Sequence, residues 1–206
     1  MSELPEKDRT DGEVPRPEVV DELVATAPVA WVDRMDHRFD QWWADTFRGH
    51  PAIDRAYYLA SELGDFSLIW QLIGVAQGLR SDPRDPEASL RLGVTLLVES
   101  LVVNQGIKRL FNRPRPVTIA PRPHALRTPM TSSFPSGHAS AAFTAAGVLA
   151  QRDPELRPIV YALAVFVATS RVHVKIHHLS DVVAGAALGA VFARIATRAW
   201  PLPDRA

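Results

Sequence analysis

Residues 134–150 read FPSGHASAAFTAAGVLA, so that Ser136, Gly137 and His138 precede a run of alanine and other small apolar residues. An apolar run without strict alternation predicts a helix rather than a strand. The free N–H groups and dipole of a helix N-terminus bind phosphate, and glycine lets the backbone approach a ligand closely. Ser136 and Gly137 therefore predict an anion site at the start of this helix. The alternative is a simple cap and turn, with His138 an incidental surface residue.

A basic block precedes this stretch, and a block with two histidines follows it. Lys108 and Arg115 lie in the run KRLFNRPRP, which on its own is more often a solvated loop. Arg171 begins the second block, in which His177 stands four residues before Asp181. At this spacing the carboxylate can bond one ring nitrogen on the same face of a helical turn and leave the other with a free lone pair. An imidazole held in this way is an oriented nucleophile.

Two other interpretations of the last block remain open at this stage. Asp181 could merely cap the last helix, and Ser180 would serve that purpose equally well. His173, His177 and His178 could also be metal ligands. The excess of cations around them argues against a metal site, which would need more carboxylates nearby.

Composition limits the classes of protein that fit this chain. Its 206 residues suffice for one domain with a substantial core. Lys and Arg total 23, as do Asp and Glu, so the basic blocks stand out against a balanced background and nucleic-acid binding is disfavoured. The chain has no cysteine, which excludes disulfides and thiolate metal sites. The first 17 residues are charged and lack an apolar core, so no cleavable signal peptide is expected.

The character of the sequence changes along the chain. Residues 1–18 are polar and predict a disordered tail, and residues 19–206 predict a single domain. Within it, residues 19–48 carry apolar side chains at three- and four-residue steps and predict an amphipathic helix. Its tryptophans suit a membrane–water interface, although a helix packed on a core shows the same period. Residues 57–196 predict the helical core.

This core contains several mostly apolar segments, all of which favour helix. Gly185 and Gly189 have the spacing of small residues that lets two helices approach closely. If each segment crosses a membrane once, the basic block and the His177 block meet on the same side. The segments are short or carry charges, so a soluble bundle remains an alternative. They span residues 57–79, 90–107, 134–150, 158–170 and 181–196.

The three blocks together resemble the signature of the type 2 phosphatidic acid phosphatase superfamily, which also contains vanadium haloperoxidases and bacterial acid phosphatases. The resemblance covers residues 108–181 in the order of the family. It implies an all-α membrane bundle of about five transmembrane helices with an N-terminal amphipathic interfacial helix, residues 19–206 forming one phosphatase domain. It also implies His177 as nucleophile, Asp181 as its orienting group and His138 as acid and base. The phosphate-binding residues that it implies are Lys108, Arg115, Ser136, Gly137 and Arg171.

The resemblance also implies an activity. We expect a membrane lipid phosphatase that hydrolyses phosphatidate, phosphatidylglycerol phosphate, or a polyprenyl phosphate or diphosphate through a phosphohistidine, without a cofactor or metal. The expected partners are the lipid phosphate and the membrane, of the bacterial cytoplasmic (inner) type. The sequence does not assign the side of the membrane or the oligomeric state. A vanadate-dependent haloperoxidase and a broad-specificity acid phosphatase are the alternatives.

Overall fold

The computed structural model describes residues 30–117, 126 and 131–202 of the chain. These residues form helices and no strand, which confirms the all-α prediction. The predicted tail of residues 1–18 lies outside the described residues, and the division into domains stays a prediction. Short helical turns extend or join the main helices, namely η1 (Asp65–Ser67), η2 (Leu101–Gly106), η3 (Ile107–Leu110) and η4 (Pro154–Leu156). The α-helices are α2 (Ala30–Phe47), α3 (Pro51–Leu63), α4 (Leu68–Gly78), α5 (Asp85–Ser100), α6 (Gly137–Arg152), α7 (Arg157–His173) and α8 (Leu179–Ala199).

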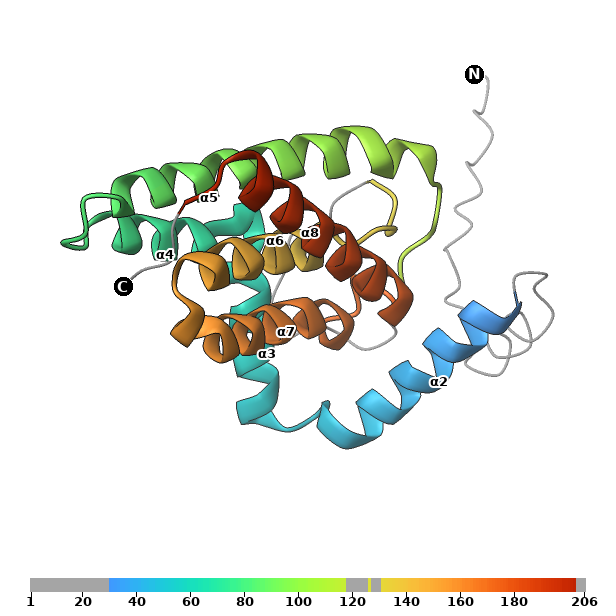
Figure 1. The fold of residues 1–206 in the computed structure, drawn as a ribbon. Helices are drawn as coiled ribbons and strands as arrows, with labels where there is room; N and C mark the ends of the chain where they lie inside the picture. Colours follow the sequence, from blue (N-terminus) through green and yellow to red (C-terminus); the bar gives the residue numbers. More distant parts are fainter. Residues whose placement is uncertain (1–29, 118–125, 127–130, 203–206) are drawn as a thin grey trace, which may run out of the picture.

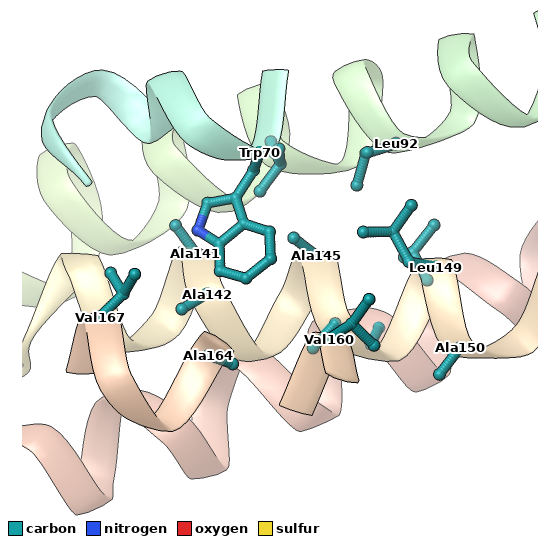
Figure 2. Packing of buried hydrophobic residues seen from close by; sticks show 14 residues of the cluster. Trp70, Leu92, Ala141, Ala142, Ala145, Leu149, Ala150, Val160, Ala164 and Val167 are labelled. Atoms are coloured by element: carbon teal, nitrogen blue, oxygen red, sulfur yellow. The ribbon is translucent and has the colours of Figure 1, made fainter. Parts of the chain in front are cut away.

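Helix α6 is the centre of the bundle. It packs against α5, α7 and α8, while α4 lies on α5 and α3 on α7 (Figure 1). Small side chains on α6, such as Ala142 and Ala145, allow its neighbours to come close (Figure 2). The fully buried Trp70 of α4 and Leu92 of α5 fill the space above them. The alanine-rich sequence of α6 thus explains why this helix, which begins at the predicted anion site, is enclosed.

Two glycines set the distance between α6 and α8. A Cβ atom on Gly185 would lie 2.3 Å from the carbonyl oxygen of Ser136, and one on Gly189 would lie 2.3 Å from that of Ser140. Real Cβ contacts are essentially never shorter than 3.0 Å, so neither position accepts a side chain without movement. The close approach predicted from the glycine spacing is confirmed. It brings the first turn of α8 against the start of α6.

The prediction of one helix over residues 57–79 is wrong. The chain forms α3 and α4 instead, separated by Gly64 and the turn η1. Phe66 and Ser67 in this turn have φ angles of 52° and 58°, a left-handed conformation that residues other than glycine rarely adopt. Hydropathy alone could not reveal the break, because Leu68 and the residues after it resume the apolar pattern.

Among the residues that the structure describes, two helical segments are long and apolar enough to cross a membrane. They are Asp85–Leu110, formed by α5 with η2 and η3, and Leu179–Ala199, which is α8. Helices α6 and α7 have 16 and 17 residues, below the roughly 20 that a span needs. The five-span bundle is therefore not confirmed. In the two long segments only 33% and 28% of the most apolar window is buried, so their apolar side chains mostly face outward.

Helix α2 confirms the predicted amphipathic helix over Ala30–Phe47; residues 19–29 lie outside the described part. Trp43 is buried and packs on Phe47 and on Tyr57 of α3. Trp31 and Trp42, by contrast, are 69% and 52% exposed. One face of α2 therefore packs against the bundle, while Trp31 and Trp42 remain exposed on the surface of the helix.

Candidate active site

The three sequence blocks meet at one end of α6. Arg115 donates from Nη1 to the carbonyl oxygen of Ile176 at 2.9 Å, which joins the first block to the third. The backbone N–H of Ser136 donates to the carbonyl oxygen of Asp181 at 3.0 Å, which joins the second block to the third. Lys108 lies close as well, because its Nζ would be 3.6 Å from a Cβ atom on Gly137. The predicted convergence of the blocks is thus confirmed.

The start of α6 has the form expected of an anion site. Ser136 is the N-cap residue, and its Oγ accepts the N–H of Ala139 at 3.4 Å. A Cβ atom on Gly137 would lie 2.9 Å from Oδ1 of Asn104, so glycine is needed to keep the backbone open beside Lys108. The N-terminal N–H groups and the Lys108 ammonium can therefore act on the same anion.

His177 and Asp181 lie together, although not on one helical turn as the spacing suggested. His177 precedes α8, His178 is the N-cap, and Asp181 is in the first turn. The Nδ1 atom of His177 is 3.6 Å from Oδ2 of Asp181, and the Nε2 atom is 3.5 Å from Nη1 of Arg115. The ring thus turns one nitrogen to the carboxylate and the other to a cation, as a nucleophile facing a bound phosphate requires.

Asp181 also completes the cap of α8. Its Oδ2 atom accepts the backbone N–H of His178 at 2.9 Å, while its Oδ1 atom accepts from Nη1 of Arg113 at 2.6 Å. The capping interpretation and the catalytic interpretation are compatible, because the same carboxylate caps α8 and lies beside the His177 ring. Ser180 is not the cap residue; its Oγ accepts from Nη1 of Arg113 at 2.6 Å.

The environment keeps His177 neutral. Burial, together with the positive charges of Arg171 and Arg115, lowers the pKa of His177 to about 3, although Asp181 opposes this shift. An imidazole of this pKa carries a free lone pair at physiological pH. The same cations that would hold a phosphate therefore also keep the predicted nucleophile in its reactive form.

His138 and Arg171 lie against the end of α3. His138 Nε2 is 3.3 Å from the carbonyl oxygen of Ser61 and 3.1 Å from Oδ1 of Asp65. Burial and the charge of Arg171 lower the pKa of His138 to about 4, and Asp65 opposes this shift. Arg171 is itself buried and donates from Nη1 to the hydroxyl of Ser61. His138, the predicted acid, and Arg171, a predicted phosphate ligand, thus both contact Ser61.

Sequence reasoning missed several of these supporting residues. In the sequence, Asp65 is only one of the charges within the apolar segment 57–79, and Ser61 carries no signal. Arg113 went unnoticed, although Arg113–Pro114 repeats the dipeptide Arg115–Pro116 two residues earlier. It bridges Asp181 to α2 through Oδ2 of Asp36 at 2.7 Å.

The metal alternative finds no support in the arrangement of the histidines. His173 accepts at Nδ1 from Nε1 of Trp43 at 3.1 Å, and its Nε2 is 2.9 Å from Oδ1 of Asp54. Among residues 30–117, 126 and 131–202, no group of three or more His, Asp or Glu side chains is placed to hold a metal ion. His173 instead joins α7 to α2 and α3.

Comparison with known proteins identifies the family of the chain. The model of the PAP2 superfamily matches residues 88–203, which include every candidate site residue. The chain belongs to the PAP2 superfamily. Like its relatives it is a phosphatase, a hydrolase of phosphate esters.

Individual PAP2 proteins resemble the chain over most of its length. A decaprenylphosphoryl-5-phosphoribose phosphatase of Mycobacterium tuberculosis is 34% identical over 148 residues, which cover 69% of this chain and 81% of that protein. The crystal structure of Aquifex aeolicus LpxE superposes with a TM-score of 0.63 at 25% identity, over 80% of this chain and 95% of that one. A transmembrane PAP2-type phosphatidylglycerolphosphate phosphatase of Bacillus subtilis has a TM-score of 0.59 at 24% identity, over 87% of this chain and 90% of that one. This similarity supports the fold of the chain.

Proposed function

We propose that the chain hydrolyses the phosphomonoester or diphosphate of a lipid through a phosphohistidine on His177. The observation that carries this proposal is the position of the His177 ring, with Asp181 behind Nδ1 and Arg115 at Nε2. This geometry suits in-line attack on a phosphorus atom held by the arginine.

The phosphate group is held by cations and by a helix start. Lys108, Arg115 and Arg171 supply three positive charges, and Ser136 and Gly137 place the phosphate at the N-terminal dipole of α6. Charge spreads over the equatorial oxygens in the transition state of phosphoryl transfer. Preorganised donors in a site sheltered from water stabilise that charge without reorganisation.

The reaction then proceeds in two steps. In the first, Nε2 of His177 bonds to phosphorus, the bond from phosphorus to the leaving oxygen breaks, and protonated His138 gives its proton to that oxygen. The bound phosphate raises the pKa of His138, because its negative charge favours the imidazolium. In the second step, neutral His138 takes a proton from water, whose oxygen bonds to phosphorus as the bond to His177 breaks. Phosphate leaves and both histidines return to their starting states.

The exposed apolar side chains of two helices support a lipid as the substrate. The outward-facing leucine and valine side chains of α5 and α8 suit a lipid environment. The relative from M. tuberculosis is named for a decaprenyl-linked phosphate, which favours a polyprenyl-linked phosphate among the lipids considered. Phosphatidate and phosphatidylglycerol phosphate are the next candidates.

The membrane arrangement is part of the same proposal. Asp85–Leu110 and Leu179–Ala199 cross the bilayer, which is a cytoplasmic membrane of the bacterial type, and α2 lies at the interface. Trp31 and Trp42 on the surface of α2 are the kind of side chain that anchors a helix there.

A panel of lipid phosphates tests the function. The purified protein in detergent should release phosphate from a polyprenyl phosphate faster than from a water-soluble sugar phosphate, and His177→Ala should release none. A preference for the sugar phosphate, together with recovery of the chain in the soluble fraction after carbonate washing, would favour the acid phosphatase alternative.

A further inference from the structure

The ring of His138 is held by two hydrogen-bond acceptors at the same nitrogen. Its Nε2 atom faces the carbonyl oxygen of Ser61 at 3.3 Å and Oδ1 of Asp65 at 3.1 Å. An atom between two acceptors must carry a hydrogen, so Nε2 remains the N–H donor in both protonation states of the ring. The proton that His138 exchanges during the reaction therefore sits on Nδ1.

The backbone around Asp65 places its carboxylate beside Nε2 of His138. After α3 the chain turns through Phe66 and Ser67, which both have positive φ angles, a conformation that persists only where the surroundings fix it. A Cβ atom on Gly64 would lie 2.6 Å from Cδ2 of His138. Gly64 thus lets the imidazole lie directly on the backbone, with the Asp65 carboxylate at its Nε2 edge.

The same turn also fixes the phosphate ligand Arg171. Nη1 of Arg171 donates to the hydroxyl of Ser61 and lies 3.5 Å from the Ser61 carbonyl oxygen. That carbonyl oxygen is the one that faces Nε2 of His138. The break between α3 and α4 is therefore a support for two functional groups, which gives a reason for the interrupted apolar segment.

We infer that Asp65 is a positioning residue for His138, which fixes the tautomer of the ring and stabilises the imidazolium that protonates the leaving oxygen. This inference rests on the proposed function, in which His138 is the acid. It assigns to Asp65 the role toward His138 that Asp181 has toward His177. The site then contains two histidine–aspartate pairs, one for the nucleophile and one for the acid.

The charged groups near His138 shift its pKa in opposite directions. Arg171 from α7 disfavours the imidazolium, Asp65 from η1 favours it, and α3 contributes the Ser61 carbonyl oxygen. Replacing Asp65 by Asn removes the favourable charge but retains a side chain of the same shape. We therefore expect the pKa of His138 in the substrate complex to fall by about one unit, as for loss of a neighbouring opposite charge.

The test compares two leaving groups on the same preparation of protein. The leaving group of dioctanoyl phosphatidate is the alkoxide of dioctanoylglycerol, which needs a proton, whereas that of p-nitrophenyl phosphate is the stable p-nitrophenolate. Asp65→Asn should lower kcat for the phosphatidate about 10- to 100-fold, part of the roughly 10²–10⁴-fold that a general acid contributes, and lower kcat for the aryl ester much less. The alkaline limb of kcat for the phosphatidate should move to lower pH. Because the two rates come from one sample, their ratio does not depend on the folded fraction.

Two matched variants separate this role from a structural one. Asp65→Glu keeps the carboxylate and should move the alkaline limb back toward that of the wild type. Glu62→Gln removes a negative charge from the exposed surface of α3 nearby and should leave the ratio of the two rates unchanged. Equal losses for both substrates in Asp65→Asn, with an unchanged alkaline limb, would show that Asp65 only supports the fold. If the wild type and Glu62→Gln release no phosphate from either substrate, the proposed function fails instead.

Discussion

Substitution of Gly185 by alanine tests how the packing of α8 on α6 sets the geometry of the site. The new Cβ atom would lie 2.3 Å from the carbonyl oxygen of Ser136, 0.7 Å short of the 3.0 Å limit for such contacts (3.0 − 2.3 = 0.7). The obstacle is backbone, so the two helices must separate. The hydrogen bond of 3.0 Å from the Ser136 N–H to the carbonyl oxygen of Asp181 would lengthen or break, since N–H···O bonds lie at about 2.7–3.2 Å.

Both stability and catalysis should respond to this separation. Overpacking costs about 1–3 kcal/mol, and each kcal/mol lowers Tm by about 2–4 °C in a chain of this size. A shift of a catalytic group by about 1 Å can reduce the rate about 10²-fold. We expect Gly185→Ala to lower Tm, followed by tryptophan fluorescence in detergent, and to lower kcat for p-nitrophenyl phosphate by more than tenfold at a temperature where it is folded.

Two other glycines provide the controls. Gly189→Ala makes the same 2.3 Å clash one turn farther along α8, with Ser140, and should lower Tm with a smaller effect on kcat. Gly93→Ala in α5 meets nothing within 4 Å and should leave kcat unchanged while stabilising the helix by up to about 1 kcal/mol. Normal Tm and kcat in Gly185→Ala would refute the claim that this contact positions Asp181.

The remaining predictions concern the charges of the site. Arg171→Lys should lower kcat/KM for a lipid phosphate by at least about tenfold, since an ammonium cannot reproduce a guanidinium contact; near-normal turnover would place Arg171 outside the site. Chelation by EDTA should leave phosphate release unchanged, because protein cations hold the phosphate, and vanadate should inhibit as a transition-state mimic; loss with EDTA that a divalent ion restores would contradict the mechanism. The lowered pKa of His177 means that protonation removes the nucleophile only near pH 3, so kcat/KM for p-nitrophenyl phosphate, corrected for substrate ionisation, should persist at pH 5. An acid limb near pH 6.5, the ordinary pKa of histidine, would show that His177 is solvated.

The sequence predicted the parts of the site that depend on local chemistry. Ser136 at a helix start and His177 near Asp181 are recognisable because caps and short spacings act within a few residues. The glycine pair of α8 was also predictable, because small residues at i and i+4 mark a close helix contact. The roles of these residues in catalysis remain predictions, which the structure makes geometrically reasonable.

The residues that the sequence did not reveal act over long distances. Asp65 lies 73 positions before His138, and Arg113 reaches back to Asp36 in α2, so neither contact has a spacing that a motif could carry. The break at Phe66 and Ser67 was hidden for another reason, because neither residue type marks a left-handed turn. Tertiary contacts determine both the long-range pairs and the break at Phe66 and Ser67. The five-span expectation is not confirmed, because α6 and α7 are shorter than the roughly 20 residues that a span needs and contribute buried side chains to the core.

Trapping the covalent intermediate shows whether His177 carries the phosphoryl group. His138→Ala should react with a ³²P-labelled aryl phosphate, whose leaving group hardly needs a proton, and then lack the base for hydrolysis. After rapid quenching at alkaline pH, we expect an acid-labile, base-stable label on the peptide that contains His177. An equal amount of label in His177→Ala, or its absence from His138→Ala while a single turnover still releases phosphate, would show that His177 does not carry the phosphoryl group.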